Sequence, residues 1–210
     1  MALVEVFADV CCPFTHVGLR RFVQRRALRS REDLVLHVRA WPLELVNGTH
    51  LDVESVASHV EELREQVAPD LFAGFDESAF PDSSLPALAL AAAAYRVDDR
   101  VGERVSLALR DALFEAGHNI GDRAVLRAIA AEQGLEVPWP DSVDPVIADW
   151  EEGKRRGVRG SPEFFVNGRG YFCPGLDISR IDGQLQIVPD VDRFDAFLAA
   201  CFQEECVSED

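Results

Sequence analysis

The sequence has little of what marks a membrane-spanning or exported chain. Its longest apolar stretch, LPALALAAAAY, is much shorter than the roughly 20 residues that a membrane-spanning helix needs. The opening MALVEVFADV has no basic start, no long apolar segment and no cleavage site of small residues. We therefore expect no membrane partner and a cytoplasmic location.

Positive charge is also scarce. The 210 residues carry a formal net charge of −16, and Lys154 is the only lysine. Nucleic-acid binding requires a concentrated basic surface, so we expect no nucleic-acid partner. The one dense basic run, Arg20 to Arg31, alternates with apolar residues and is interpreted as the solvated face of a helix.

The number of cysteines is too small and odd for a disulfide framework in a cytoplasmic chain. Adjacent Cys11 and Cys12 are poorly placed to bond to each other, because the peptide between them strains the bridge. Cys12 and His16 have helical spacing, but no second ligand pair accompanies them, so no metal site is expected. The five cysteines are Cys11, Cys12, Cys173, Cys201 and Cys206. We expect Cys11 to be a small buried residue, and Cys201 and Cys206 to be structural or merely exposed.

What the sequence does contain is an α/β pattern interrupted by helices. An apolar run at 3–7, helical spacing over 13–28 and a second apolar run at 34–43 form a βαβ unit with parallel strands. The stretch from 51 to 150 contains no convincing strand and has repeated helical spacing with polar outer faces. The pattern predicts a helical block placed inside an α/β frame.

The frame resumes after a helix at 144–157. Two short apolar runs flank Asn167-Gly168, which is a strong signal for a tight hairpin. A further edge segment is expected at 184–188 and a closing helix at 190–205.

Four segments, in this order, resemble the DsbA-like branch of the thioredoxin fold. They are DVCCPFTHVG, RAWPLELVNG, LRDALFEAGHNIGDRAVLRAIAAEQGL and GVRGSPEFFVNG. The branch includes FrnE-type dithiol oxidoreductases, kappa-class glutathione transferases and 2-hydroxychromene-2-carboxylate isomerases. The resemblance implies a thioredoxin-like domain made of residues 1–45 and 146–210, with an all-helical insertion at 46–145.

The resemblance also implies a catalytic site. Cys12 would be the nucleophile at the first turn of a helix, where the helix dipole and free N–H groups would lower its pKa. Pro162 would be the cis-proline opposite the sulfur. With Ser161, Pro13 and Phe14, it would form the surface that binds a substrate or a small thiol.

Three positions leave alternatives open. Thr15 stands where dithiol oxidoreductases have their second cysteine, and it either donates a hydrogen bond to Cys12 or merely replaces the lost thiol. His16 either stabilises a Cys12 thiolate or packs in the core. Cys173 either approaches Cys12 as an unconventional resolving thiol or faces away from it.

The first functional hypothesis is a thiol-disulfide oxidoreductase with the monothiol site Cys-Pro-Phe-Thr. Cys12 would form mixed disulfides that an external thiol resolves, with catalytic Cys12 and Thr15. The alternatives are a transferase or isomerase that uses a bound thiol cofactor, or a redox-inactive binding module. No tightly bound cofactor is expected; the partner would be a disulfide-containing substrate or a low-molecular-weight thiol of the glutathione or mycothiol kind. Many proteins that share this resemblance form dimers, so a homodimer is a further alternative.

Overall fold

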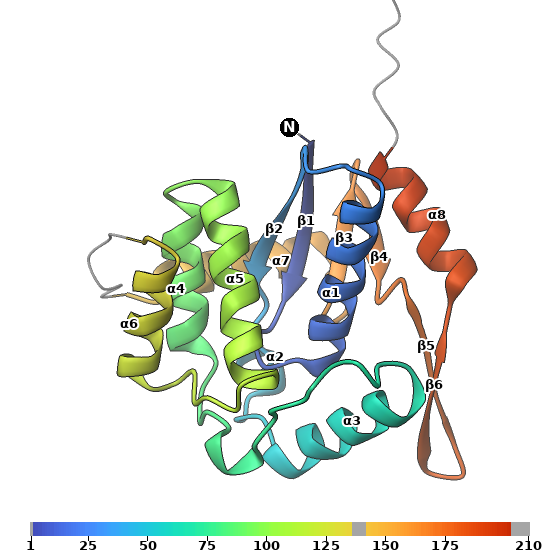
Figure 1. Cartoon of the computed structure of the whole chain (residues 1–210), viewed down its shortest axis with the longest axis horizontal. Helices are drawn as coiled ribbons and strands as arrows, with labels where there is room; N and C mark the ends of the chain where they lie inside the picture. Colours follow the sequence, from blue (N-terminus) through green and yellow to red (C-terminus); the bar gives the residue numbers. More distant parts are fainter. Residues whose placement is uncertain (1, 136–141, 203–210) are drawn as a thin grey trace, which may run out of the picture.

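A four-stranded sheet forms the centre of the computed structural model, which describes residues 2–135 and 142–202 (Figure 1). The strands lie in the order β2-β1-β3-β4. Their bounds are β1 Ala2–Ala8, β2 Leu34–Ala40, β3 Glu163–Val166 and β4 Arg169–Phe172. β1 and β2 are parallel, whereas β3 is antiparallel to both β1 and β4. The predicted βαβ start of an α/β fold is confirmed, with α1 (Pro13–Leu28) as its crossover helix.

The hairpin between β3 and β4 is the tight turn that the sequence predicts. Asn167 and Gly168 both have positive φ, at 50° and 77°. Two consecutive residues of this kind match the right-handed twist of the strands they join. The turn fixes the register of the hairpin. Glu163 therefore lies opposite Phe172 at the open end of the hairpin, next to Pro162.

Helices cover both faces of the sheet, because side chains of a strand point alternately to opposite faces. On one face, Val6 packs with Phe22 of α1 and Phe197 of α8 (Val191–Phe202). On the other face, Phe7 and Trp41 pack with α7 (Asp144–Arg156). These two layers hold β1 in the middle of the molecule, directly before the turn that carries Cys12.

The described residues between β2 and α7 form helices joined by turns and no strand, and their apolar side chains pack in a core that also includes Val10, Val17 and Leu176. The elements of this helical segment are α2 Leu43–Asn47, α3 Val53–Gln66, the 3-10 turn η1 Glu77–Ala79, α4 Leu85–Tyr95, α5 Asp99–Phe114 and α6 Arg123–Glu132. The prediction of a strand-free helical block is confirmed for these residues. The division into domains at 45/46 and 145/146 stays a proposal.

The second apolar run is shorter than predicted. β2 ends at Ala40 rather than at 43, because Pro42 has no N–H and the chain turns there into α2. The sequence does not predict the short helix α2, since five residues are too few for helical spacing to be recognised.

A separate two-stranded hairpin, β5 (Leu176–Ile181) with β6 (Gln184–Pro189), extends past the end of α3 (Figure 1). The sequence predicts β6 and misses β5, whose alternation of apolar and polar residues is weak. Gln66 at the end of α3 holds the hairpin by donating to Leu185 O at 3.2 Å and accepting from Ile187 N at 2.8 Å. The expected closing helix is α8, which ends at Phe202, and the rest of that expectation, with Cys206, lies outside the described residues.

The basic run on α1 is a solvated face only in part, because Arg25 and Arg29 are exposed whereas three other arginines form ion pairs. Arg20 pairs with Asp111, Arg21 pairs with Asp70 at 2.5 Å, and Arg26 pairs with Glu103 at 2.5 Å. All three acids belong to the helical segment, so the arginines attach α1 to it. The sequence could not show this, because the acids are between 49 and 91 positions away from the arginines. None of the helices in the described part of the chain has the length and hydropathy to cross a bilayer.

Candidate active site

Cys12 occupies the N-cap of α1, between the end of β1 and the first helical turn. Its φ and ψ of −82° and 115° are extended, and its carbonyl accepts the first helical bond, from His16 N at 3.2 Å. Pro13 follows at the first helical position, where its missing N–H costs nothing. Only 4% of Cys12 is exposed. The turn therefore places the sulfur at the helix N-terminus, beneath the surface.

Thr15 and Ser161 meet around the sulfur of Cys12. The Cys12 Sγ–H donates to Ser161 O at 3.2 Å, and Thr15 Oγ1 lies 2.8 Å from Ser161 Oγ. Asp9 N donates to the same Ser161 Oγ at 2.9 Å. The Ser161–Pro162 peptide bond is cis. Residues about 150 positions apart thus form one connected hydrogen-bonded group.

The pKa of Cys12 is raised, so the expectation of a lowered pKa is wrong for this state of the site. Burial is the largest cause, and it outweighs the hydrogen bonds of Thr15 and Ser161 that favour the thiolate. The nearby charge of Asp9 raises the pKa further. Helix position alone predicted the opposite, because it gave no information on burial. The resting site therefore holds a thiol surrounded by donors that can stabilise a thiolate.

A buried polar cluster around Asp9 holds the turn that leads from β1 to Cys12. The Asp9 carboxylate accepts from Cys11 N at 2.8 Å, Leu43 N at 2.6 Å and Ser84 Oγ at 3.2 Å, and burial raises its pKa. Arg110, only 1% exposed, donates to Asp9 O at 3.2 Å. Burial lowers the pKa of Arg110.

Asp9 and Arg110 received no role in the sequence analysis. Asp9 is the first residue of DVCCPFTHVG, the segment that also contains Cys12, and this position was a signal for a role in the site. Arg110 falls on the buried side of α5, four residues after the buried Ser106, and a charged residue at such a position was a second signal.

His16 faces away from Cys12, which favours the packing alternative. Its ring lies between Phe72 and Phe114, with centroids 5.3 and 5.0 Å away, and its Nε2 lies 2.6 Å from Glu115 Oε1. Burial lowers the pKa of His16 and outweighs the hydrogen bond with Glu115, which favours the charged ring. Phe14 packs against His59, at 5.3 Å between ring centroids. The residues brought together are therefore Cys12, Thr15, Ser161 and Pro162, whereas His16 belongs to the core.

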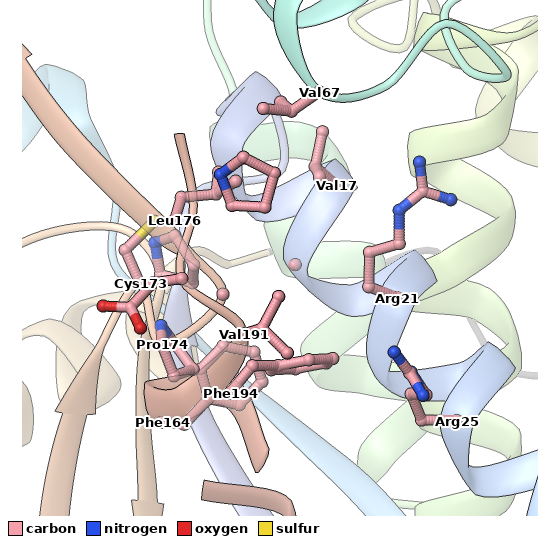
Figure 2. A pocket seen from close by; sticks show the side chains of 15 residues that line it. Val17, Arg21, Arg25, Val67, Phe164, Cys173, Pro174, Leu176, Val191 and Phe194 are labelled. Carbon is pink, nitrogen blue, oxygen red and sulfur yellow. The ribbon is translucent and has the colours of Figure 1, made fainter. Parts of the chain in front are cut away.

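A pocket of about 160 Å³ opens on the other side of Pro162 (Figure 2). Its floor is apolar and includes Val17, Phe164 and Phe194, and Cys173 and Leu176 line one wall. Arg21 and Arg25 of α1 lie along the opposite edge (Figure 2). The pocket can accept an apolar or weakly anionic group next to the cis-proline. The sequence did not predict this pocket, because its lining residues are spread along the chain from position 17 to position 194.

The remaining described cysteines are buried, and none is in a disulfide. Cys11 packs in the core of the helical segment, as expected, and Cys201 packs in the core of the sheet. Cys173 lines the pocket just described. Within residues 2–135 and 142–202, no group of three potential metal ligands gathers at one place.

Comparisons with known proteins agree with this geometry. The family model for the DSBA-like thioredoxin domain matches residues 3–200. No curated protein matches the chain.

Among solved structures, the chain is similar to the cytosolic disulfide reductase DsbM from Pseudomonas aeruginosa. The identity is 20%, the TM-score is 0.59, and the match covers 93% of this chain and 96% of DsbM. DsbM has also been solved with GSH; in that comparison the identity is 18%, the TM-score is 0.59, and 93% and 96% of the two chains are covered.

Two further structures have the same fold. A 2-hydroxychromene-2-carboxylate isomerase is 12% identical with a TM-score of 0.58, over 81% of this chain and 88% of that one. A "probable DsbA oxidoreductase" from Streptomyces coelicolor is 20% identical with a TM-score of 0.59, over 81% and 83%. At these identities the likeness shows the fold. In this chain the features of that fold are the sheet order, the helical segment and the cis peptide bond.

Proposed function

Since the chain belongs to the DSBA-like thioredoxin domain family, we propose that it is a thiol-disulfide oxidoreductase with Cys12 as its nucleophile. The observation that carries the proposal is the placement of the Cys12 sulfur. It lies at a helix N-terminus, against Ser161 O and beside a hydroxyl pair made by Thr15 and Ser161. A thiolate at this place would find donors already oriented towards it.

The reaction is a thiol-disulfide exchange. The Cys12 thiol loses its proton, and the thiolate attacks one sulfur of a substrate disulfide. A mixed disulfide forms on Cys12, and the other half of the substrate leaves as a thiol. Thr15 cannot release the half of the substrate that stays bound to Cys12, because a hydroxyl group does not attack a disulfide as a thiolate does. A low-molecular-weight thiol supplies the electrons that return Cys12 to its reduced form.

The pocket beside Pro162 supports a substrate with more than a bare disulfide. Its apolar lining and Arg25 on its edge fit a small thiol with an acidic group, of the glutathione kind, whereas Arg21 is already paired with Asp70. DsbM, which was solved with GSH, is a cytosolic disulfide reductase, and this supports both a small-thiol partner and a cytoplasmic location for this chain. The homodimer stays a prediction.

The second candidate is a transferase or isomerase in which a bound thiol does the chemistry. The Thr15–Ser161 hydroxyl pair favours it, because two hydroxyl groups can donate to the sulfur of a bound thiol without help from Cys12. In that case Cys12 would only orient the cofactor.

Cys12→Ala distinguishes the two candidates. As an oxidoreductase, this variant loses disulfide exchange with glutathione disulfide entirely and takes no adduct in intact mass spectrometry. Cys201→Ala, which changes a buried cysteine in the sheet core, keeps the disulfide exchange of the parent. If Cys12→Ala exchanges disulfides as fast as the parent, Cys12 is not the nucleophile and the proposal fails.

A further inference from the structure

Two consecutive carbonyl groups of one loop each accept a hydrogen bond from a different cysteine. The Cys12 Sγ–H donates to Ser161 O at 3.2 Å, and Cys173 N donates to Pro162 O at 3.0 Å. The antiparallel ladder that pairs Glu163 with Phe172 thereby continues by one more step. Cys173 therefore stands beside the same cis-proline that Cys12 faces from the end of α1.

The Cys173 sulfur lies on the pocket side of this loop. Only 5% of the residue is exposed, and it lines the pocket together with Pro162 and Val17. Figure 2 shows the sulfur directed towards the end of the pocket at which Val17 is labelled. Val17 is in the second turn of α1, close to the helix end that carries Cys12. The two thiols therefore approach the cis-proline from neighbouring sides.

The two thiols also interact electrostatically. Burial raises the pKa of Cys173 to about 12, and the charge of Cys12 contributes to the rise, whereas Arg193 lowers it. The thiol that Cys12 holds at rest and the mixed disulfide that replaces it are both neutral, so neither opposes a thiolate at Cys173.

Arg193 holds the segment that carries Cys173. It donates to the carbonyl of Cys173 at 3.0 Å, to that of Pro174 at 3.3 Å and to that of Leu176, and it pairs with Asp190 at 3.3 Å. Its positive charge is therefore fixed next to Cys173. A cation in this position favours the thiolate that an attack on a disulfide requires.

The other described cysteines do not have these contacts. Cys11 is next to Cys12 in the chain, but a bridge between adjacent residues is strained, and burial raises its pKa well above the ordinary value. Cys201 is as buried as Cys173, and its pKa is also raised to about 12, by burial alone. It lies in the sheet core on α8 and so serves as a matched control.

We propose that Cys173 is the resolving thiol of the site and takes the role that Thr15 cannot fill. This inference rests on the proposed function, because it needs the mixed disulfide on Cys12. The Cys173 sulfur attacks the Cys12 sulfur, a Cys12–Cys173 disulfide forms, and the bound half of the substrate leaves as a thiol with the proton of Cys173. The substrate disulfide gains two electrons in total, and the two cysteines lose them. Two equivalents of a small external thiol then reduce the cysteine pair and are themselves joined as a disulfide.

The test is the reaction of the full chain with one equivalent of glutathione disulfide, stopped with acid. Intact mass spectrometry is expected to show the parent with two hydrogens fewer and no glutathione, and peptide mapping a Cys12–Cys173 bridge. Cys173→Ser is expected to accumulate glutathione on Cys12, whereas Cys201→Ser should behave as the parent does. The mapping of the parent does not depend on whether either variant folds.

The outcomes separate this inference from the function on which it rests. A parent that keeps glutathione on Cys12, without a bridge, overturns the role of Cys173 and leaves Cys12 as the nucleophile. A parent that forms neither adduct nor bridge overturns the proposed function itself. If Cys201→Ser accumulates the adduct as Cys173→Ser does, the effect is not specific to Cys173 and the inference also fails.

Discussion

Thr15 Oγ1 and Ser161 Oγ lie 2.8 Å apart, and this pair occupies the place where a dithiol site would hold its second sulfur. Thr15 is fully buried, and its hydroxyl also bonds to Cys12, so the position is filled and its polar group is satisfied. The first turn of α1 thus holds one thiol, and a hydroxyl group fills the place of the second.

Thr15→Cys is expected to resolve the mixed disulfide faster than Cys173 does, because burial raises the pKa of Cys173 to about 12. A thiol at this position lies one helical turn after Cys12, within reach of its sulfur, and can resolve a mixed disulfide. Reduction of insulin by the variant with dithiothreitol should be at least about tenfold faster than by the parent. Thr15→Val, which has a similar volume but no thiol, is the control and should show no gain. An equally fast parent would show that Cys173 already resolves the mixed disulfide as efficiently as a thiol at position 15, and the expectation would be wrong.

The alkylation rate of Cys12 is expected to rise with pH over the whole range from 6 to 9. Burial raises the pKa of Cys12, so the thiolate fraction increases about tenfold per pH unit below that pKa. The measurement is iodoacetamide labelling followed by mass mapping of each cysteine. A rate that levels off below pH 7 would contradict the raised pKa.

Asp9→Asn is expected to speed the alkylation of Cys12 at pH 8. The charge of Asp9 raises the pKa of Cys12, and its removal leaves a neutral amide that can still accept one of the backbone bonds. Ser84→Ala is the matched control, since it removes a donor to Asp9 without removing the charge. Unchanged labelling in Asp9→Asn would mean that this carboxyl is already protonated at pH 8.

Glu115→Gln is expected to cost about 2 kcal/mol at pH 7 and nearly nothing near pH 2. Burial alone would raise the pKa of Glu115, but bonds from His16, Phe72 N and Ala73 N outweigh it and hold the pKa at about 2. Because the folded pKa lies below the unfolded one, this stability is present above the unfolded pKa. It is lost as the pH falls from about 4.5 towards 2. Urea unfolding of the parent and the variant at both pH values measures the difference, and an equal loss at both would contradict it.

Two arginines of α1 are expected to differ strongly in their contribution to stability. Arg26 and Glu103 have only 14% and 9% of their side chains exposed, and Glu103 also accepts from Leu36 N at 2.7 Å. Arg26→Met leaves that carboxylate buried without its partner, at a cost of about 3 kcal/mol. Arg21→Met breaks an exposed pair with Asp70 and should cost less than about 1 kcal/mol. Thermal unfolding of both variants tests the contrast, which would be wrong if the two losses were equal.

The sequence predicted the elements well because their signals are local. The bounds of α1 were predicted to the residue, since Pro13 begins the helix and the apolar spacing continues to Leu28. The hairpin at Asn167-Gly168 was equally clear, because two residues alone determine that turn. The strand β5 was missed, since it forms by pairing with β6, which in turn is held by Gln66.

The sequence predicted which residues form the site, but it did not predict the direction in which the pKa of Cys12 is shifted. Cys12 and Pro162 could be brought together only through a resemblance, because 149 residues separate them. The raised pKa of Cys12 depends on burial, which arises from segments that no local pattern connects. The orientation of His16 likewise depends on Glu115, which is on another helix.

The arginine pairs along α1 have a consequence for how the protein unfolds. The helix that carries Cys12 packs on the sheet through Leu19 and Phe22, and it is tied to the helical segment through Arg20, Arg21 and Arg26. We therefore expect the sheet and the helical segment to unfold together. Removal of residues 46–145 would take away the ion-pair partners of all three arginines.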